Sequence, residues 1–399
     1  MDIRTPWHAI EKHPMGGWRK VAEPALPALD PARRLLWCGI GGSLLPSETL
    51  VRAFGDDQAT RNWVPLASPE PTPDFRLQPG DQLVCASKSG KTLELWTWIA
   101  RLRALPGFKD LAPPLLITQD DANPLATWGR ANGCRILPIP VEVGGRFSAF
   151  TPIGTLPLAW MGRDAAAFLR GGREVIAQIE ADAGPWRDRI AQTVALLLDA
   201  HDGGISEWVL MPYAMRLDNL SAWWVQLIAE SLGKVAKDGT RKGFTPIRAV
   251  GPVDQHSQLQ RWMAGPRNLG VIVMTVEGGA DMPGGGRLLA AARDVPTGSS
   301  YVREKLDPPP GCPYPGLAGL QGADILRAQA EGSADALEVA GVPVLRWTMP
   351  RLDEHELGAF MMAWQAIVGI LGMAMNLDPF DQPEVEDGKK RTFKRLGLG

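Results

Sequence analysis

The stretch "DQLVCASKSGKTLELWTWIARLR", from Asp81 to Arg103, indicates a strand, a loop and a helix in direct succession. Its apolar start is followed by a loop of small hydroxyl residues, glycine and two lysines. Leu95, Ile99 and Leu102 then recur at helical spacing, which predicts that the loop turns straight into a helix. A strand that leads into a helix in this way is the repeating unit of parallel α/β folds, so the stretch indicates the fold class.

The same alternation recurs along the rest of the chain. Short apolar runs separated by helix-length segments lie at 33–40, 113–120, 134–142, 206–213, 245–251, 269–277 and 342–349. We therefore predict an α/β protein with two doubly wound parallel-sheet domains, each a three-layer α/β/α arrangement, with connecting and C-terminal helices.

The predicted domain boundaries follow from this alternation of strands and helices. We place the first domain at residues 1–185, the second at 186–375 and a C-terminal tail at 376–399. The segment 165–201 is rich in helix-forming residues and is predicted to form the connecting helices. Two Gly- and Pro-rich stretches, 277–287 and 306–319, are predicted to be surface loops.

Composition narrows the classes of function. The chain has 399 residues and a formal net charge of −2, which provides no basic field for nucleic acid or for an anionic membrane. Its four cysteines form no Cys-x-x-Cys pair, which favours reduced thiols and a cytoplasmic location. His, Cys, Asp and Glu show no metal-ligand spacing, so we expect neither a metal nor another cofactor.

One segment resembles a membrane span by length. Residues 357–376 carry no charge over about the length that a bilayer requires. Gln365 lies inside this segment and no other span accompanies it, so we interpret it as a buried core helix. The N-terminal residues also lack the basic start and the apolar core of a secretory signal. No membrane association is therefore expected.

Two loops after predicted strands are candidates for ligand binding. In the first loop, Gly39, Gly41 and Gly42 precede Ser43, and such glycines let the backbone approach an anion. A tight chain reversal explains the same pattern. In the second loop, 87–92, three hydroxyl residues surround a glycine at a predicted helix N-terminus, where the helix dipole attracts negative charge. Ordinary helix capping explains these hydroxyls equally well, and a phosphate on a small molecule is the alternative.

Six motifs extend over most of the chain. They are "GIGGS" (39–43), "SKSGKT" (87–92), "GGRFSAFTPIG" (144–154), "AESLGK" (229–234), "VDQHSQ" (253–258) and "PFDQPEVEDGKK" (379–390). In order and approximate spacing they resemble the phosphoglucose isomerase family, which belongs to the wider sugar isomerase (SIS) fold family. The shorter bacterial type is the most similar. Two departures are Lys91, where the family usually has threonine, and Glu384, where it commonly has glycine.

The resemblance implies a role for specific residues of each motif. The implied sugar-phosphate site consists of Gly42, Ser43, Ser87, Lys88, Ser89, Thr92 and Gln382. Glu230 matches the base that moves a proton between C2 and C1, and Arg146 matches the cation that faces the enediolate. His256 and Lys389 match residues that assist ring opening. The implied assembly is a homodimer in which the two subunits share each active site.

This chemistry requires these residue types. An aldose and a ketose interconvert when a proton leaves a carbon next to a carbonyl, so a base must reach both carbons while a fixed cation stabilises the enediolate oxygen. The implied activity is glucose 6-phosphate isomerisation in glycolysis and gluconeogenesis. Two alternatives remain: an enzyme that also accepts mannose 6-phosphate, and a module of the same fold that binds a sugar phosphate without converting it.

Overall fold

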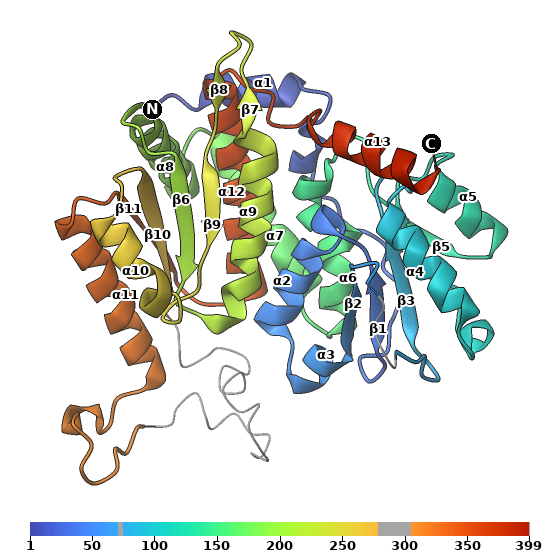
Figure 1. Cartoon of the computed structure of the whole chain (residues 1–399), viewed down its shortest axis with the longest axis horizontal. Coiled ribbons are helices and arrows are strands. Elements are labelled where there is room, and N and C mark those ends of the chain that lie inside the picture. Colours follow the sequence, from blue (N-terminus) through green and yellow to red (C-terminus); the bar gives the residue numbers. More distant parts are fainter. Residues whose placement is uncertain (71–74, 278–304, 399) are drawn as a thin grey trace.

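The first sheet lies in the N-terminal half of the chain. The computed structural model describes residues 1–70, 75–277 and 305–398 (Figure 1). Five parallel strands pair in the order β2-β1-β3-β4-β5. They are β1 (Leu35–Cys38), β2 (Trp63–Leu66), β3 (Gln82–Ala86), β4 (Leu115–Thr118) and β5 (Arg135–Pro138).

The second sheet repeats the winding of the first. Four parallel strands pair in the order β11-β10-β6-β9, and the first strand in sequence again lies inside the sheet. They are β6 (Glu207–Pro212), β9 (Thr245–Arg248), β10 (Leu269–Val276) and β11 (Val344–Met349). The α/β fold class with parallel sheets is thus confirmed, as are all the strands that the apolar runs predict.

Two elements were missed by the sequence analysis. Strand β2 contains Pro65 and only four residues, and its edge position explains why it tolerates a residue without an amide hydrogen. An antiparallel hairpin of β7 (Lys234–Val235) and β8 (Arg241–Lys242) begins at the last residue of the "AESLGK" motif. Its strands are too short and too polar to show a period of two.

Alternating side chains of the first sheet meet two different helix layers. Leu35 and Trp37 of β1 belong to the large central core, whereas Leu36 and Cys38 belong to a separate cluster on the other face. Helix α2 (Leu45–Phe54) packs into the central core, and α4 (Leu93–Ala104) packs into the other cluster. The connections that follow β1 and β3 therefore lie on opposite faces of the sheet, and ligands of such sheets typically bind at the carboxyl ends of two strands related in this way.

The remaining helices cover both sheets and join them. They are α1 (Arg4–Lys12), α3 (Asp57–Asn62), α5 (Pro124–Ala131), α6 (Pro152–Trp160), α7 (Ala165–Glu180), α8 (Pro185–Asp202), α9 (Asp218–Leu232), α10 (Gln255–Ala264), α11 (Gly322–Val339), α12 (Glu354–Ala374) and α13 (Val385–Leu396). Helices α7 and α8 confirm the predicted connecting helices.

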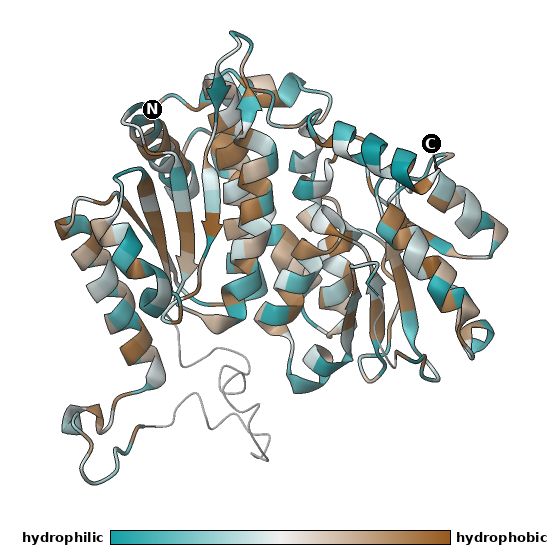
Figure 2. Ribbon diagram, viewed as in Figure 1, coloured by the Kyte–Doolittle hydropathy of each residue, from teal (hydrophilic) through white to brown (hydrophobic). Residues whose placement is uncertain are grey.

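Helix α12 is the apolar segment that resembled a membrane span. It is the one helix of the described residues that is long and apolar enough to cross a bilayer, and most of its apolar stretch is buried inside the protein. Helices α1, α7, α8 and α9 pack around it. Figure 1 shows α12 between the two sheets, and Figure 2 shows its hydrophobic colouring. The prediction of a buried core helix is confirmed.

The central core is shared by both halves of the chain. Its side chains extend from Ile3 to Phe380 and come from both halves of the chain. The boundaries at residues 185 and 375 therefore stay a prediction. Of the two predicted loops, 306–319 is exposed and irregular apart from a single turn, Pro315–Leu317, whereas 277–287 lies outside the described residues except for its first position.

Candidate active site

Two glycine-containing motifs meet through their backbones. A Cβ atom on Gly42 would lie 2.3 Å from the carbonyl carbon and oxygen of Gly145. The Ser148 hydroxyl donates a 2.8 Å hydrogen bond to the Gly42 carbonyl, which holds the two segments together. The glycine in "GIGGS" thus allows a close approach that no other residue type could make. Since Arg146 follows directly, this contact also positions the next functional residue.

Arg146 is buried and almost fully hydrogen-bonded. Its Nε donates to the Ser231 hydroxyl (2.7 Å), and its Nη1 donates to Gln382 Oε1 (2.9 Å). Its Nη2 donates to the carbonyls of Pro379 (2.6 Å) and Asp381 (2.9 Å). A guanidinium carries five N–H groups, so these bonds leave one Nη1–H. Burial lowers the pKa of Arg146, and the nearby Glu230 carboxylate counteracts this effect.

The remaining donor of Arg146 faces Glu230. The distance between Arg146 Nη1 and Glu230 Oε2 is 3.6 Å, and the other carboxylate oxygen accepts a 3.0 Å bond from Gln226 one turn earlier on α9. Gln226 in turn packs against Gly41, where φ is +56°. The Glu230 side chain keeps 31% of its surface exposed. A partly accessible carboxylate therefore stands beside a rigidly held cation.

The predicted phosphate loop lies at the carboxyl end of β3, beside β1. The Ser87 and Thr92 hydroxyls are 2.8 Å apart, and Ser87 Oγ also accepts from the Gly90 amide. Gly90 has φ +66°, and a Cβ there would lie 2.1 Å from Asn123 Oδ1. Thr92 occupies the N-cap position of α4, yet its side chain makes no capping bond. Ser89 is exposed and accepts from the Lys91 amide. Capping alone therefore does not account for these hydroxyls.

The Lys88 side chain bonds outside this loop. Its Nζ donates a 2.8 Å bond to the Val141 carbonyl, on the segment that leads from β5 to Arg146. Burial lowers the pKa of Lys88, although nearby Glu142 partly offsets the effect. Lys88 thus ties the predicted phosphate loop to the chain that carries the guanidinium, and a direct contact with substrate stays a prediction.

Two predicted residues lie apart from this cluster. His256 is exposed on the first turn of α10, and Lys389 is exposed on α13, where its Nζ donates to Glu386 Oε1 (2.6 Å). No described contact joins either side chain to Glu230 or Arg146. Helix α13 has no buried residue among those described, and Figure 2 shows its hydrophilic surface. Of the remaining predicted residues, Gly42, Glu230 and Gln382 lie beside Arg146. The loop 87–92 is joined to the segment before Arg146 through Lys88.

Known proteins similar to this chain include glucose-6-phosphate isomerases. The chain is 36% identical over 371 residues to the glucose-6-phosphate isomerase of Thermus thermophilus. The aligned region covers 90% of this chain and 82% of that relative. The chain belongs to the glucose-6-phosphate isomerase family. No family model matches it.

Solved structures extend the likeness to the fold. A hypothetical protein of Thermus thermophilus superposes with a TM-score of 0.78 at 29% identity, over 99% of this chain and 89% of that one. A glucose-6-phosphate isomerase of Chlamydia trachomatis superposes with a TM-score of 0.68 at 18% identity, over 98% and 73%. The likeness to solved structures thus covers nearly the whole chain and shows a shared fold.

Sequence reasoning missed three residues that hold the family motifs together. Ser231 and Lys234 lie within the quoted "AESLGK" motif, and Gln226 lies four residues before Glu230. Helical spacing could have indicated Gln226, because residues i and i+4 share a helix face. Neither spacing nor composition indicates that Ser231 bonds Arg146, since the two are 85 residues apart.

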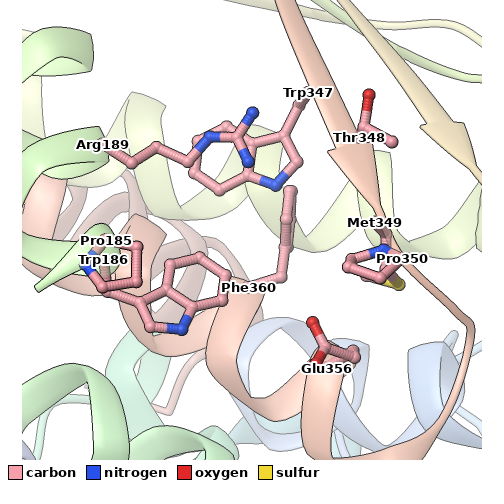
Figure 3. A pocket seen from close by; sticks show the side chains of 9 residues that line it. All are labelled: Pro185, Trp186, Arg189, Trp347, Thr348, Met349, Pro350, Glu356 and Phe360. Carbon is pink, nitrogen blue, oxygen red and sulfur yellow. The ribbon is translucent and has the colours of Figure 1, made fainter.

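A separate cavity of about 260 Å³ lies at the other end of α12 (Figure 3). Trp186, Trp347 and Phe360 line it, and the Arg189 guanidinium lies 4.6 Å from the centre of the Trp347 ring. Phe360 precedes Ala374, the last residue of α12, by 14 positions, so about 21 Å of helix lies between the cavity and the segment that follows α12. None of the predicted site residues lines it.

Proposed function

We propose that this chain interconverts glucose 6-phosphate and fructose 6-phosphate by moving a proton between C2 and C1. The observation that carries the proposal is the pair formed by the Glu230 carboxylate and the last N–H of Arg146, 3.6 Å apart. Aldose–ketose isomerisation needs a mobile base beside a fixed cation, and a module that only binds the phosphate needs neither.

The geometry supports a division of labour within this pair. Glu230 is anchored by Gln226 through one oxygen, so its other oxygen can take the proton from C2 of the open-chain aldose and return it to C1. Electrons from the C2–H bond move to the C1 carbonyl oxygen, which carries the negative charge of the enediolate. A proton then passes from the O2 hydroxyl to O1, and the C2 carbonyl forms as C1 takes the proton from Glu230. Arg146, whose other donors are occupied, is pre-oriented to stabilise that charge without rearrangement.

The direct test is a coupled assay with fructose 6-phosphate, followed by mannose 6-phosphate in the same format. We expect turnover of fructose 6-phosphate. Turnover of both sugars favours the bifunctional alternative. Turnover of neither, with a sugar phosphate still bound, favours the binding module and overturns the proposal.

The phosphate loop leads to a first prediction. The double variant Ser89→Ala/Thr92→Ala should raise KM for fructose 6-phosphate more than it lowers kcat, because phosphate contacts stabilise ground and transition states alike. Steady-state kinetics measure both constants. Thr97→Ala is the matched control, since its hydroxyl bonds the Leu93 carbonyl within α4 and not the loop. An unchanged KM in the double variant would place the phosphate elsewhere.

The exposed position of His256 leads to a second prediction. We propose a homodimer in which His256 reaches the active site of the partner and assists ring opening, with Lys389 as a second helper. An imidazole titrates near neutral pH and is suited to both proton transfers of ring opening. Sedimentation at the assay concentration should give a dimer.

Subunit mixing tests the sharing of the site. When inactive His256→Ala and Glu230→Gln proteins are mixed and allowed to exchange subunits, half of the dimers are mixed and each has one intact site. Activity should therefore recover to about a quarter of the wild-type value. No recovery after proven exchange, or full activity in a monomer, contradicts the shared site.

The cysteines support a cytoplasmic location for this isomerase. Cys38, Cys85, Cys134 and Cys312 are all free thiols, and the first two are buried. Proteins of oxidising compartments use cysteines as disulfides far more often.

A further inference from the structure

Lys234 is a buried cation directly beside the proposed active site. It follows α9 by two residues, begins strand β7 and lies four residues after Glu230. Its exposed fraction is 9%, which is unusual for lysine. No described hydrogen bond joins it to Glu230 or to the phosphate loop.

All three donors of the Lys234 ammonium go to one segment of chain. Nζ donates to the carbonyls of Asp378 and Asp381 and to the Asp381 carboxylate. This segment, 378–382, follows α12 and ends at Gln382. Opposite Lys234, His13 Nε2 lies 3.3 Å from the Asp378 carboxylate, and the His13 ring packs against Phe380.

The same segment supplies the acceptors of Arg146. The Asp381 carbonyl accepts from both Lys234 Nζ and Arg146 Nη2, and the next residue, Gln382, accepts from Arg146 Nη1. Two buried cations therefore hold one short segment from two sides. Their mutual repulsion is offset by Asp378 and Asp381, whose charges act on both cations.

This arrangement fixes the plane of the guanidinium. A planar group held through Nη2 by a carbonyl and through Nη1 by an amide oxygen cannot rotate while those acceptors stay in place. Lys234 determines where one acceptor lies and, through the backbone, where the other lies. The orientation of the last Arg146 N–H toward Glu230 consequently depends on a residue that contacts neither substrate nor base.

We propose that Lys234 is a positioning residue for the isomerase: it holds segment 378–382 so that Asp381 and Gln382 orient Arg146 toward Glu230. This role rests on the proposed function, because its measure is turnover. A lysine that merely anchored the C-terminal part of the chain would affect stability without a selective effect on kcat.

The hairpin provides a matched control. Lys242 is the direct cross-strand partner of Lys234, and its Nζ donates a 3.1 Å bond to the Met375 carbonyl at the end of α12. Lys242 therefore anchors the C-terminal end of α12, directly before the segment that Lys234 holds. No described hydrogen bond joins it to segment 378–382 or to Arg146, so it reproduces the anchoring without the positioning.

The test compares Lys234→Met with Lys242→Met in the fructose 6-phosphate assay, at a temperature where circular dichroism shows both folded. Lys234→Met should lower kcat about 10- to 100-fold, as expected for a misplaced catalytic group, and change KM by less than about threefold. Lys242→Met should keep kcat within about twofold of the wild type. If Lys234→Met does not fold, Lys234→Gln, which keeps two N–H donors, replaces it.

A double-mutant cycle identifies the route of the effect. In a Gln382→Ala background, Lys234→Met should lower kcat by less than about threefold, because both substitutions release the same guanidinium. Equal kcat for folded Lys234→Met and Lys242→Met, or losses that multiply with Gln382→Ala, would overturn the positioning role alone. A wild-type protein without turnover would instead overturn the proposed function and this role together.

Discussion

Glu230→Gln should abolish isomerisation while leaving the sugar phosphate bound. The amide keeps an oxygen to accept from Gln226 Nε2 but cannot accept a proton. General-base catalysis contributes about 10²- to 10⁴-fold, and a base that works in both directions should reach the upper end, so kcat should fall by about 10⁴. Affinity for the sugar phosphate should stay within about tenfold, since the phosphate loop is untouched.

Solvent exchange separates loss of the base from other defects. In deuterated water, nuclear magnetic resonance should show the C2 hydrogen of glucose 6-phosphate exchanging with the wild-type protein and not with Glu230→Gln. Glu331→Gln, at an exposed glutamate on α11, is the control and should exchange at the wild-type rate. Exchange that persists in Glu230→Gln near the wild-type rate would assign the base to another residue.

Arg146→Met should lower both turnover and stability. Loss of one preorganised donor to a developing oxyanion costs about 10²- to 10³-fold in kcat. The acceptors on Ser231, Pro379, Asp381 and Gln382 would also lose a buried partner, which should reduce the free energy of unfolding by about 3–5 kcal/mol. Steady-state kinetics and urea unfolding measure the two effects.

Two further variants serve as controls for Arg146→Met. Arg146→Lys keeps the charge without the planar fork, so it should recover part of the stability but little of the turnover. Arg189→Met removes a half-buried arginine from the far end of α12 and should leave kcat unchanged. Wild-type kcat in folded Arg146→Met would remove Arg146 from the mechanism.

The sequence predicts the sheets because each buried strand is a short run of apolar residues that can be recognised locally. Parallel strands covered on both faces appear as short apolar runs, and helix-length spacers between them imply crossover connections. Strand β2 shows no such apolar run, because Pro65 interrupts it and its edge position requires less burial. The fold class was therefore predictable, whereas the order of the strands emerged only from the structure.

The motif resemblance names individual candidate residues but not the contacts that join them. Motif resemblance identified Arg146, Glu230 and Gln382 separately, and nothing local connects residues 236 positions apart. The role of Lys234 depends on the path of the chain after α12, which no spacing rule describes. His256 and Lys389 remain predictions, because they lie on exposed helix faces of one chain.

The bonding of Arg146 also determines when the site can form during synthesis. Its acceptors lie 85, 233, 235 and 236 residues downstream, so nearly all of them belong to the last part of the chain to emerge. At 5–20 residues per second, Gln382 appears roughly 10–50 s after Arg146. The first sheet, from Leu35 to Pro138, contains only earlier residues and can pair in that interval. Until segment 378–382 docks, water must satisfy the guanidinium, so the catalytic centre becomes ordered only after the last part of the chain has been synthesised.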